Sequence, residues 1–300
     1  MALKADGRIA IRQTLALAWR ELWHVWVVGL LLLAAPQLLV AALFKWLLPL
    51  TAYAPGHPPG GRAVLEFGIG YILILLLFCA VYVLFIRLFL LGRSHAFRLT
   101  PGQLAGYTLR FVWKGILVVL VTMVMMTIVM MALMIPLMII GLIFGIAFGK
   151  PENATPQGAA LVVGVLIVLI MFVVTTTVYV MIAIRFYPVF FGAAIGQNVC
   201  LREAWRAMSG YTWRTFVALL PPGLIMYAPV LVLYAILLPR MRSDPYAAFD
   251  MLRNAWWIGI LLLPLTYVAY GWTVAILSNI YRDLWPAPEG IFEEEEESAP

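Results

Sequence analysis

The sequence predicts an all-α, polytopic integral membrane protein with six transmembrane helices, arranged as three hairpins and joined by interfacial amphipathic helices. Of the 300 residues, 64% are hydrophobic and only 11% are charged, whereas soluble domains carry roughly a quarter charged residues. The apolar runs are long and continuous rather than alternating, which favours helices over a closed barrel. Basic residues also gather on alternate sides of these runs, as they do in multi-pass proteins.

The basic residues predict the topology. If both termini are cytoplasmic, 14 of the 20 Lys and Arg fall in cytoplasmic segments and 6 fall in outside loops. This asymmetry favours six spans with the N- and C-termini inside. The formal charge of +6 would also suit nucleic acid, but basic loops in so apolar a chain serve topology and meet anionic lipid. We therefore expect membrane lipids as partners and no nucleic acid.

Three regions are expected along the chain. Residues 1–24 read as a cytoplasmic amphipathic helix, 25–282 as the six-helix transmembrane domain, and 283–300 as an acidic, disordered cytoplasmic tail. A cleavable signal peptide is the alternative for the first region, although the apolar run continues through Leu48 without a small-residue cleavage site. For the five-glutamate tail, contact with a basic partner is the alternative. The apolar face of the first helix comprises Ile11, Leu15, Ala18, Trp19 and Leu22.

The third apolar run is too long for one straight crossing. Residues 115–149 carry no charge and would span roughly 52 Å as a helix, against a hydrocarbon core of roughly 30 Å. This helix must tilt, kink near Pro136 or protrude. A capping box at Thr100–Gln103 predicts a separate, short interfacial helix before it. The six spans are expected at about 25–44, 67–86, 115–149, 159–184, 216–238 and 256–278.

A weak internal repeat accompanies the spans. The tripeptide Gly-Tyr-Thr occurs at Gly106 and again at Gly210. An arginine follows the second, fourth and sixth spans, and we read three units of interfacial helix, span, loop and span. The alternative is that any hairpin inserted with its basic ends inside has arginines there. These arginines are Arg87, Arg185 and Arg282.

The stretch between Arg185 and Arg214 reads as the centre of the chain. Its second half has helical periodicity, with Trp205 on the apolar face and Arg202 and Arg206 on the other. Asn198 is expected to cap this helix and Gly210 to end it. Such a helix would lie in the membrane interface with its arginines among lipid headgroups. The candidate headgroup contacts are Arg110, Lys114, Arg185, Arg202, Trp205, Arg206 and Arg214.

The residues Glu203-Ala204-Trp205-Arg206, Ser209-Gly210 and Trp213-Arg214 resemble a short element of a known family. It is similar to one found in bacterial six-span proteins related to the membrane domain of glycerophosphoryl diester phosphodiesterases, and in YciC-like proteins. The resemblance implies a helical fold in the bacterial inner membrane. It implies no phosphodiesterase activity, because these 300 residues include no counterpart of that family's catalytic barrel.

Few residues of this sequence suit catalysis. We expect no Asp, Glu, Lys or His within the apolar cores, and we place Arg87 and Arg185 at span ends. This absence disfavours an ion-coupled transporter and an enzyme, since both need ionisable groups at the working site. We therefore predict no catalytic residue and no cofactor. Cys79 and Cys200 fall on opposite halves of the topology, so no disulfide is expected.

Two side-chain patterns in the third span have alternative readings. Met126, Met130 and Met134 share one helix face and could hold Cu(I), because thioethers are soft ligands. The structural reading is adaptable packing between helices or against lipid, and we predict no metal. Farther along, small residues permit close helix approach, either within the monomer or in a homo-oligomer or membrane-protein complex. These are Gly141, Gly145 and Gly149.

Together these features predict a non-enzymatic inner-membrane protein that binds anionic lipid, partner subunits or both. It would serve envelope or lipid homeostasis, or act as a membrane scaffold. The alternative is a transporter or channel for a small solute or a lipid, with Cu(I) as the least favoured cargo.

Overall fold

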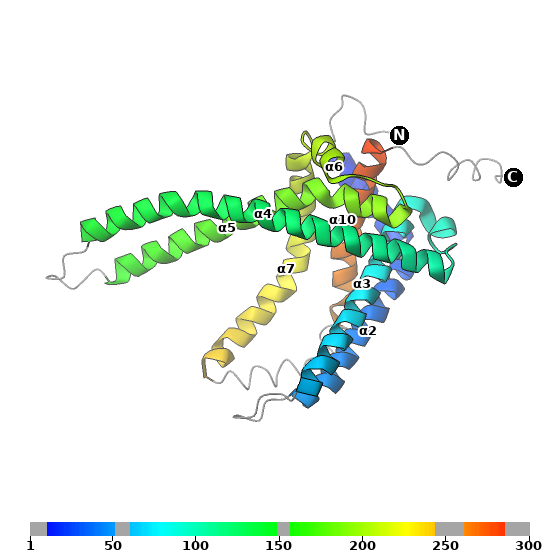
Figure 1. The fold of residues 1–300 in the computed structure, drawn as a ribbon, viewed down its shortest axis with the longest axis horizontal. Helices are drawn as coiled ribbons and strands as arrows, with labels where there is room; N and C mark the ends of the chain where they lie inside the picture. The colour runs from blue at the N-terminus through cyan, green and yellow to red at the C-terminus, as the bar shows by residue number, and fades with distance from the viewer. Residues whose placement is uncertain (1–10, 52–60, 149–156, 244–260, 286–300) are drawn as a thin grey trace.

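The computed structural model describes residues 11–51, 61–148, 157–243 and 261–285, and side-chain surroundings for 11–39, 65, 68–136, 170–227 and 261–285. All elements in these ranges are α-helices, as predicted (Figure 1). Eight helices are described: α1 Ile11–His24, α2 Trp26–Thr51, α3 Gly61–Ala96, α4 Pro101–Phe148, α5 Gln157–Ile195, α6 Leu201–Ala207, α7 Thr212–Ser243 and α10 Leu263–Leu284.

Three described segments are long and apolar enough to cross a membrane. They are Gly68–Ala96 of α3, Pro101–Pro136 of α4 and Ile170–Ile195 of α5. The helix α1 and the first part of α2 would make a fourth crossing if the bent pair counts as one span. Only 11% of the most apolar window of α4 is buried, and such an apolar surface is unfavourable in water at about 25 cal/mol per Å². The protein is therefore membrane-embedded.

The long helices pack in neighbouring pairs. The helix α2 contacts α3, α4 contacts α5, and α7 contacts α10. Figure 1 shows the α4–α5 pair and the α2–α3 pair diverging from a common end, where α1 and α6 also lie. The far halves of the pairs leave many large apolar side chains exposed, including Ile72, Leu73 and Met131.

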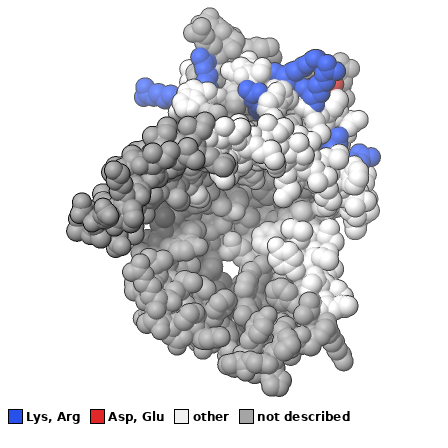
Figure 2. All heavy atoms as spheres, turned by 60° about the vertical axis from the view of Figure 1, so that its left-hand side comes forward, with Lys and Arg blue, Asp and Glu red and all other residues white. Residues whose placement is uncertain are grey.

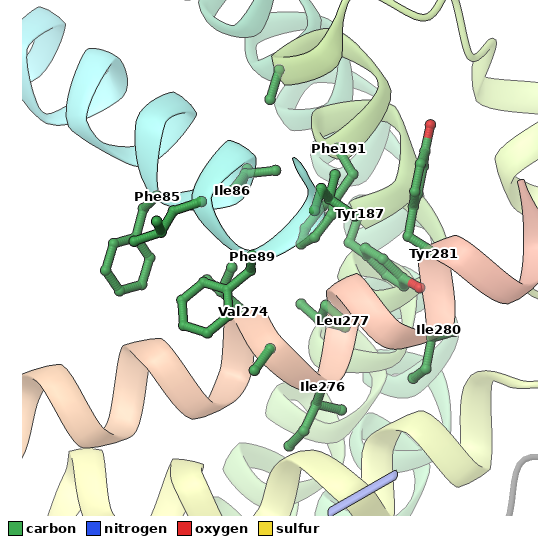
Figure 3. Packing of buried hydrophobic residues seen from close by; sticks show 14 of the residues in the cluster. Phe85, Ile86, Phe89, Tyr187, Phe191, Val274, Ile276, Leu277, Ile280 and Tyr281 are labelled. Atoms are coloured by element: carbon green, nitrogen blue, oxygen red, sulfur yellow. The ribbon is translucent and has the colours of Figure 1, made fainter. Parts of the chain in front are cut away.

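The hydrophobic core lies at this common end. The helix α3 contributes Phe85, α5 contributes Phe191, and α10 contributes Val274, Ile276 and Ile280, all at most 2% exposed. Figure 3 shows Phe85 and Phe191 on the side of α10 that faces α3 and α5, whereas Ile276 and Ile280 point to the other side of α10. The last turns of α10 are therefore packed on nearly every side, which fixes where the ends of the other helices can lie.

A sharp bend separates α1 from α2. The two helices meet at 75°, and the Tyr267 hydroxyl of α10 donates a hydrogen bond of 2.7 Å to the Leu22 carbonyl at the end of α1. Gly271 allows the contact, because a Cβ there would lie 2.4 Å from Leu22 Cδ1. The bend thus depends on close approach between α1 and α10.

The sequence predicts that the second apolar segment ends at Arg87, but the structure shows that it does not. Helix α3 continues to Ala96, with a non-helical break at Gly92, whose φ is 74°. Arg87 lies inside the core and is only 7% exposed. The prediction is wrong because a charged residue does not by itself end a helix. Here the regular helix is interrupted at Gly92, since glycine adopts a positive φ readily.

The short helix expected before the third span is wrong as well. The capping box is present, since the Thr100 amide donates to Gln103 Oε1 at 3.1 Å and the Gln103 amide to Thr100 Oγ1 at 3.3 Å. No break follows it, and α4 runs for 48 residues. At 1.5 Å per residue this is about 72 Å, more than twice the hydrocarbon thickness of about 30 Å. Glycines at 102, 106 and 115 weaken a helix but do not stop one whose neighbours support it.

Candidate functional site

A pocket of about 380 Å³ lies between α5, α6 and α7. Its apolar wall comes from α5 and includes Ile182, and its polar side holds Arg185, Ser209 and Thr212. Two tryptophans, Trp205 and Trp213, complete the lining. A basic group, hydroxyls and an apolar wall in one pocket suit an amphiphile whose charged end is anionic.

Arg185 is held in a fixed orientation in this pocket. Its Nε donates to Thr212 Oγ1 at 3.1 Å, and its guanidinium lies 4.3 Å from the ring centroid of Trp205. The Thr212 hydroxyl in turn donates to the Met208 carbonyl at 2.7 Å, so its oxygen is aimed at Arg185. The two terminal nitrogens of Arg185 have no hydrogen-bond partner among the described residues, which leaves them available to an anion.

The helix α6 positions Trp205 and two further arginines. Ala204 and Met208 are fully buried, whereas Arg202 and Arg206 are exposed, as the periodicity predicts. Neither arginine has a partner within the described chain. The face of α6 that carries them therefore adds two positive charges beside the pocket.

The start of α6 differs from the prediction. Cys200 rather than Asn198 is the N-cap residue, and its amide donates to Glu203 Oε2 at 3.1 Å. This hydrogen bond to the Cys200 amide is the main reason that the pKa of Glu203 lies below its usual value. The helix ends at Ala207 with Met208 as its C-cap, so Gly210 lies in the following turn and does not end it. A cysteine is a weak capping residue by type, and the acid three residues later is the signal that identifies this cap.

The other candidate headgroup contacts serve different roles. Lys114 is half-buried and donates to Asn198 Oδ1 at 3.2 Å and to the Val199 carbonyl at 3.3 Å. It ties α4 to the segment between α5 and α6. Arg110 is exposed on α4, and Arg214 is half-buried near the start of α7.

Arg87 is the residue that sequence reasoning missed. Its Nη1 donates to the Ala194 carbonyl at 3.2 Å and its Nη2 to the His95 carbonyl at 3.4 Å, and its guanidinium lies 5.1 Å from the Tyr107 ring centroid. These carbonyls belong to the last turns of α5 and α3, where helix carbonyls lack intrahelical partners. The available signal was its place before Gly92, since helix carbonyls near a break need donors.

The three arginines at the predicted unit ends make corresponding contacts. Arg87 lies against Tyr107 and Arg185 against Thr212, and both partners belong to the Gly-Tyr-Thr tripeptide of the following unit. Arg282 pairs with Glu21 at 3.0 Å, so the end of the last predicted unit contacts the first unit. Each unit end thus contacts the beginning of another unit.

The basic side chains visible on one face of the molecule gather at one end. Figure 2 shows the blue Lys and Arg atoms at the top of the view, the end where α6 lies in Figure 1. Described residues other than Lys, Arg, Asp and Glu, drawn in white, occupy the surface below them. Charge gathered at one end, with uncharged surface beyond it, is the pattern of a membrane interface.

The methionine stripe and the glycine motif fall outside this site. Met130 Sδ accepts a hydrogen bond of 3.5 Å from Thr175 Oγ1 of α5, Met126 packs against the core, and Met134 is 53% exposed. Within the described residues, no group of three or more His, Cys, Asp and Glu could hold a metal ion. The side chains of residues 137–169 lie outside the described set, and Gly141, Gly145 and Gly149 are among them.

The fold and the site define a class: an all-helical, membrane-embedded protein with a basic, tryptophan-lined pocket at one end of its apolar helices. Comparison of the chain with protein-family models, with curated proteins and with solved structures found no match. The resemblance of residues 203–214 to the six-span family stays a prediction.

Proposed function

We propose that the protein is a non-enzymatic, multi-pass protein of the bacterial inner membrane that binds anionic lipid through the pocket around Arg185. The observation that carries this proposal is the arrangement of Arg185 itself. It is oriented by Thr212 and Trp205, and its two terminal nitrogens have no partner among the described residues and lie beside an apolar wall. A phosphate or phosphodiester is the anion that such a guanidinium binds best, because two of its donors can engage two oxygens at once.

The surroundings of the pocket support a lipid rather than a soluble anion. Trp213 lines the pocket and is 61% exposed, and exposed tryptophans concentrate at membrane interfaces. Arg202 and Arg206 add charge on the adjoining face of α6. The apolar segment of α5 that forms the wall also continues toward exposed residues such as Tyr179 and Phe172. An acyl chain could follow this surface while the phosphate meets Arg185.

The proposed topology has six spans in three hairpins, with both termini in the cytoplasm. The pairing of α2 with α3, α4 with α5 and α7 with α10 supports this arrangement, as do the contacts between successive unit ends. The basic end would then face the cytoplasmic leaflet, whose anionic lipids attract Lys and Arg. In the cell the protein would serve lipid or envelope homeostasis, or hold partner subunits in the membrane.

Removal of charge tests the lipid site. The affinity of the Arg185 site for phosphatidylglycerol or cardiolipin should fall about 30-fold in the double variant Arg202→Gln/Arg206→Gln and on the order of 100-fold when Arg185→Gln is added, since each basic residue near an anionic leaflet contributes about 1 kcal/mol. Native mass spectrometry of protein extracted in mild detergent measures the retained lipid. The apolar helices are unchanged, so membrane insertion should persist.

The matched control is Arg12→Gln/Arg98→Gln, which removes two other exposed charges. It should retain anionic lipid almost as the unchanged protein does. Equal losses in the control and in the α6 double variant would reduce these arginines to diffuse attraction or to a role in topology, and the proposal of a site would fail.

A transporter or channel is the second candidate. The buried Arg87 favours it, because an ionisable group at depth in a membrane protein often marks a transport path. Against this, Arg87 is engaged with two carbonyls and a tyrosine, and its position is explained by structure. Flux of a defined solute, a lipid or Cu(I) in proteoliposomes would favour this candidate over lipid binding alone.

A further inference from the structure

A second pocket, of about 530 Å³, lies where α1, α3 and α10 meet. Arg20, Glu21 and Trp23 line it from α1, Leu88 and Phe89 from α3, and Arg282 from α10. A volume of this size is within the range of small-ligand sites, roughly 300–1,000 Å³. None of the roles described above accounts for it.

The fold holds the walls of this pocket in place. Helix α1 ends at His24 before the 75° bend, and α3 breaks at Gly92. Arg282 then joins the two, because its Nη1 donates to Glu21 Oε1 at 3.0 Å and its Nη2 donates to the Phe89 carbonyl. Arg93 donates to the His24 carbonyl at 3.3 Å, which adds a second link between α3 and the end of α1.

The charge in the pocket is positive. The single carboxylate, Glu21, is already paired with Arg282 and accepts from Asn279 Nδ2 at 3.2 Å. Arg20 has no hydrogen bond or ion pair with any described residue, and it lines the pocket. Arg93 stands at the neighbouring end of α3. An anion entering the pocket would therefore meet a guanidinium that no described carboxylate neutralises.

Apart from His24 and Gly92, the rest of the lining is hydrophobic, and exposed aromatic side chains lie beside it. Val25, Leu88 and Phe89 are buried, whereas Trp23 is 46% exposed and Trp26, at the start of α2, is exposed too. A free inorganic anion would gain no binding energy from contact with these hydrophobic side chains. A molecule with a phosphate and an apolar chain would satisfy both parts.

The position of the pocket repeats that of the first one. Arg185 ends the second unit and lies in a pocket against the beginning of the third, and Arg282 ends the third unit and lies in a pocket against the beginning of the first. Each pocket includes a unit-end arginine and an exposed tryptophan, Trp213 or Trp23. At the remaining junction Arg87 is buried.

We propose that the pocket at the α1–α2 bend is a second binding site for the phosphate of a membrane lipid, with Arg20 as its charged ligand and Trp23 and Val25 against the lipid's apolar part. This proposal rests on the proposed function, since it gives the same lipid class a second position. It predicts two separable classes of bound anionic lipid.

A charge series at one position tests this site. Affinity for phosphatidylglycerol should fall about fivefold in Arg20→Gln and about 25-fold in Arg20→Glu, and it should be kept in Arg20→Lys, because each unit of charge near an anionic headgroup changes binding by roughly fivefold. Arg12, two turns earlier on α1 and also exposed, receives the same three substitutions as the control. The full-length protein is reconstituted in nanodiscs of increasing phosphatidylglycerol content in a phosphatidylcholine background, and native mass spectrometry of the lipid released with it gives the affinities.

The outcomes separate the two proposals. Two sites are supported if the affinity for phosphatidylglycerol depends on the charge at position 20 but not at position 12, and if the Arg185/Arg202/Arg206 variant separately loses the lipid of the first site. Equal dependence at 12 and 20, or none at either, overturns the second site and leaves the first intact. If the unchanged protein shows no preference for phosphatidylglycerol, both proposals fail.

A soluble competitor identifies the ligand's source. Glycerol 3-phosphate at millimolar concentration should not displace the lipid or raise the thermal unfolding midpoint, because it lacks the chain that meets Trp23 and Val25. Stabilisation by glycerol 3-phosphate that depends on Arg20 would instead assign the pocket to a free phosphate ester and overturn the lipid proposal.

Discussion

Arg87 shows how one buried cation can organise the ends of several helices. It is 7% exposed, has no acidic partner among the described residues and instead donates to carbonyls of α5 and α3. Carbonyls at helix ends carry partial negative charge and lack intrahelical donors. Arg282 likewise donates to the Phe89 carbonyl shortly before the break in α3, and Lys114 donates to the Val199 carbonyl in the segment between α5 and α6. Part of the positive charge that reads as a topology signal is therefore also structural.

Replacing Arg87 should destabilise the protein. Arg87→Met leaves one buried and one partly buried carbonyl without this donor, so we expect a loss of about 1–3 kcal/mol in the free energy of unfolding. The loss should be smaller for Arg87→Lys, which keeps one donor group. Thermal unfolding in mild detergent measures both. Arg98→Met, at an exposed position without a described partner, should change stability by less than about 0.5 kcal/mol. A stabilised Arg87→Met variant would mean that desolvation of the guanidinium outweighs its hydrogen bonds.

At the scale of helices, the contact between α1 and α10 depends on the absence of a side chain. A Cβ at Gly271 would lie 2.4 Å from Leu22 Cδ1, and Leu22 is fully buried. Gly271→Ala should therefore cost about 1–3 kcal/mol through overpacking, measured as a lower unfolding midpoint. It should also weaken the lipid site at the α1–α2 bend.

Gly106→Ala is the matched control for that substitution. A Cβ at Gly106 would meet nothing within 4 Å, and the position is inside α4. Alanine there should be neutral or stabilise by up to about 1 kcal/mol. If both alanine variants unfold alike, close approach at Gly271 does not hold the bend.

The methionine stripe of α4 belongs to the same scale. Changing Met126, Met130 and Met134 together to Leu should leave folding nearly intact, because the volume is kept and each swap costs less than about 1.5 kcal/mol. Met130 would lose only a hydrogen bond of 3.5 Å from Thr175. Thermal unfolding and a Cu(I) titration of the purified protein check this. Stoichiometric Cu(I) binding that disappears in the triple variant would contradict the structural reading.

For the whole molecule, the topology is the prediction that reporter fusions can test. Fusions after Pro55, Glu152 and Ser243 should be periplasmic, and fusions after Arg98, Gln197 and Glu297 should be cytoplasmic, because 14 of the 20 basic residues then lie inside. A periplasmic signal at Gln197 would place the Arg185 pocket in the other leaflet and contradict both the six-span topology and the cytoplasmic lipid site.

The sequence by itself determined the class of the protein and the character of its surfaces. A composition of 64% hydrophobic residues, arranged in long continuous runs, predicts helices in lipid, and the periodicity of residues 201–208 predicted which side of α6 is buried. For Arg185 and Trp205 the sequence predicted only that both lie on the same side of the membrane, and not that they are in contact. These properties are local, because they depend on spacing along one helix.

Only the tertiary structure decided which charges are free. Apart from Gly92, nothing near Arg87 in the sequence distinguishes it from Arg185 or Arg20. In the structure Arg87 is buried against carbonyls, Arg185 is fixed in a pocket, and Arg20 has no described partner. Their partners lie up to 107 positions away along the chain. The continuous α4 and the break at Gly92 were decided in the same way, because packing against neighbouring helices outweighs the weak local preferences that mark helix ends.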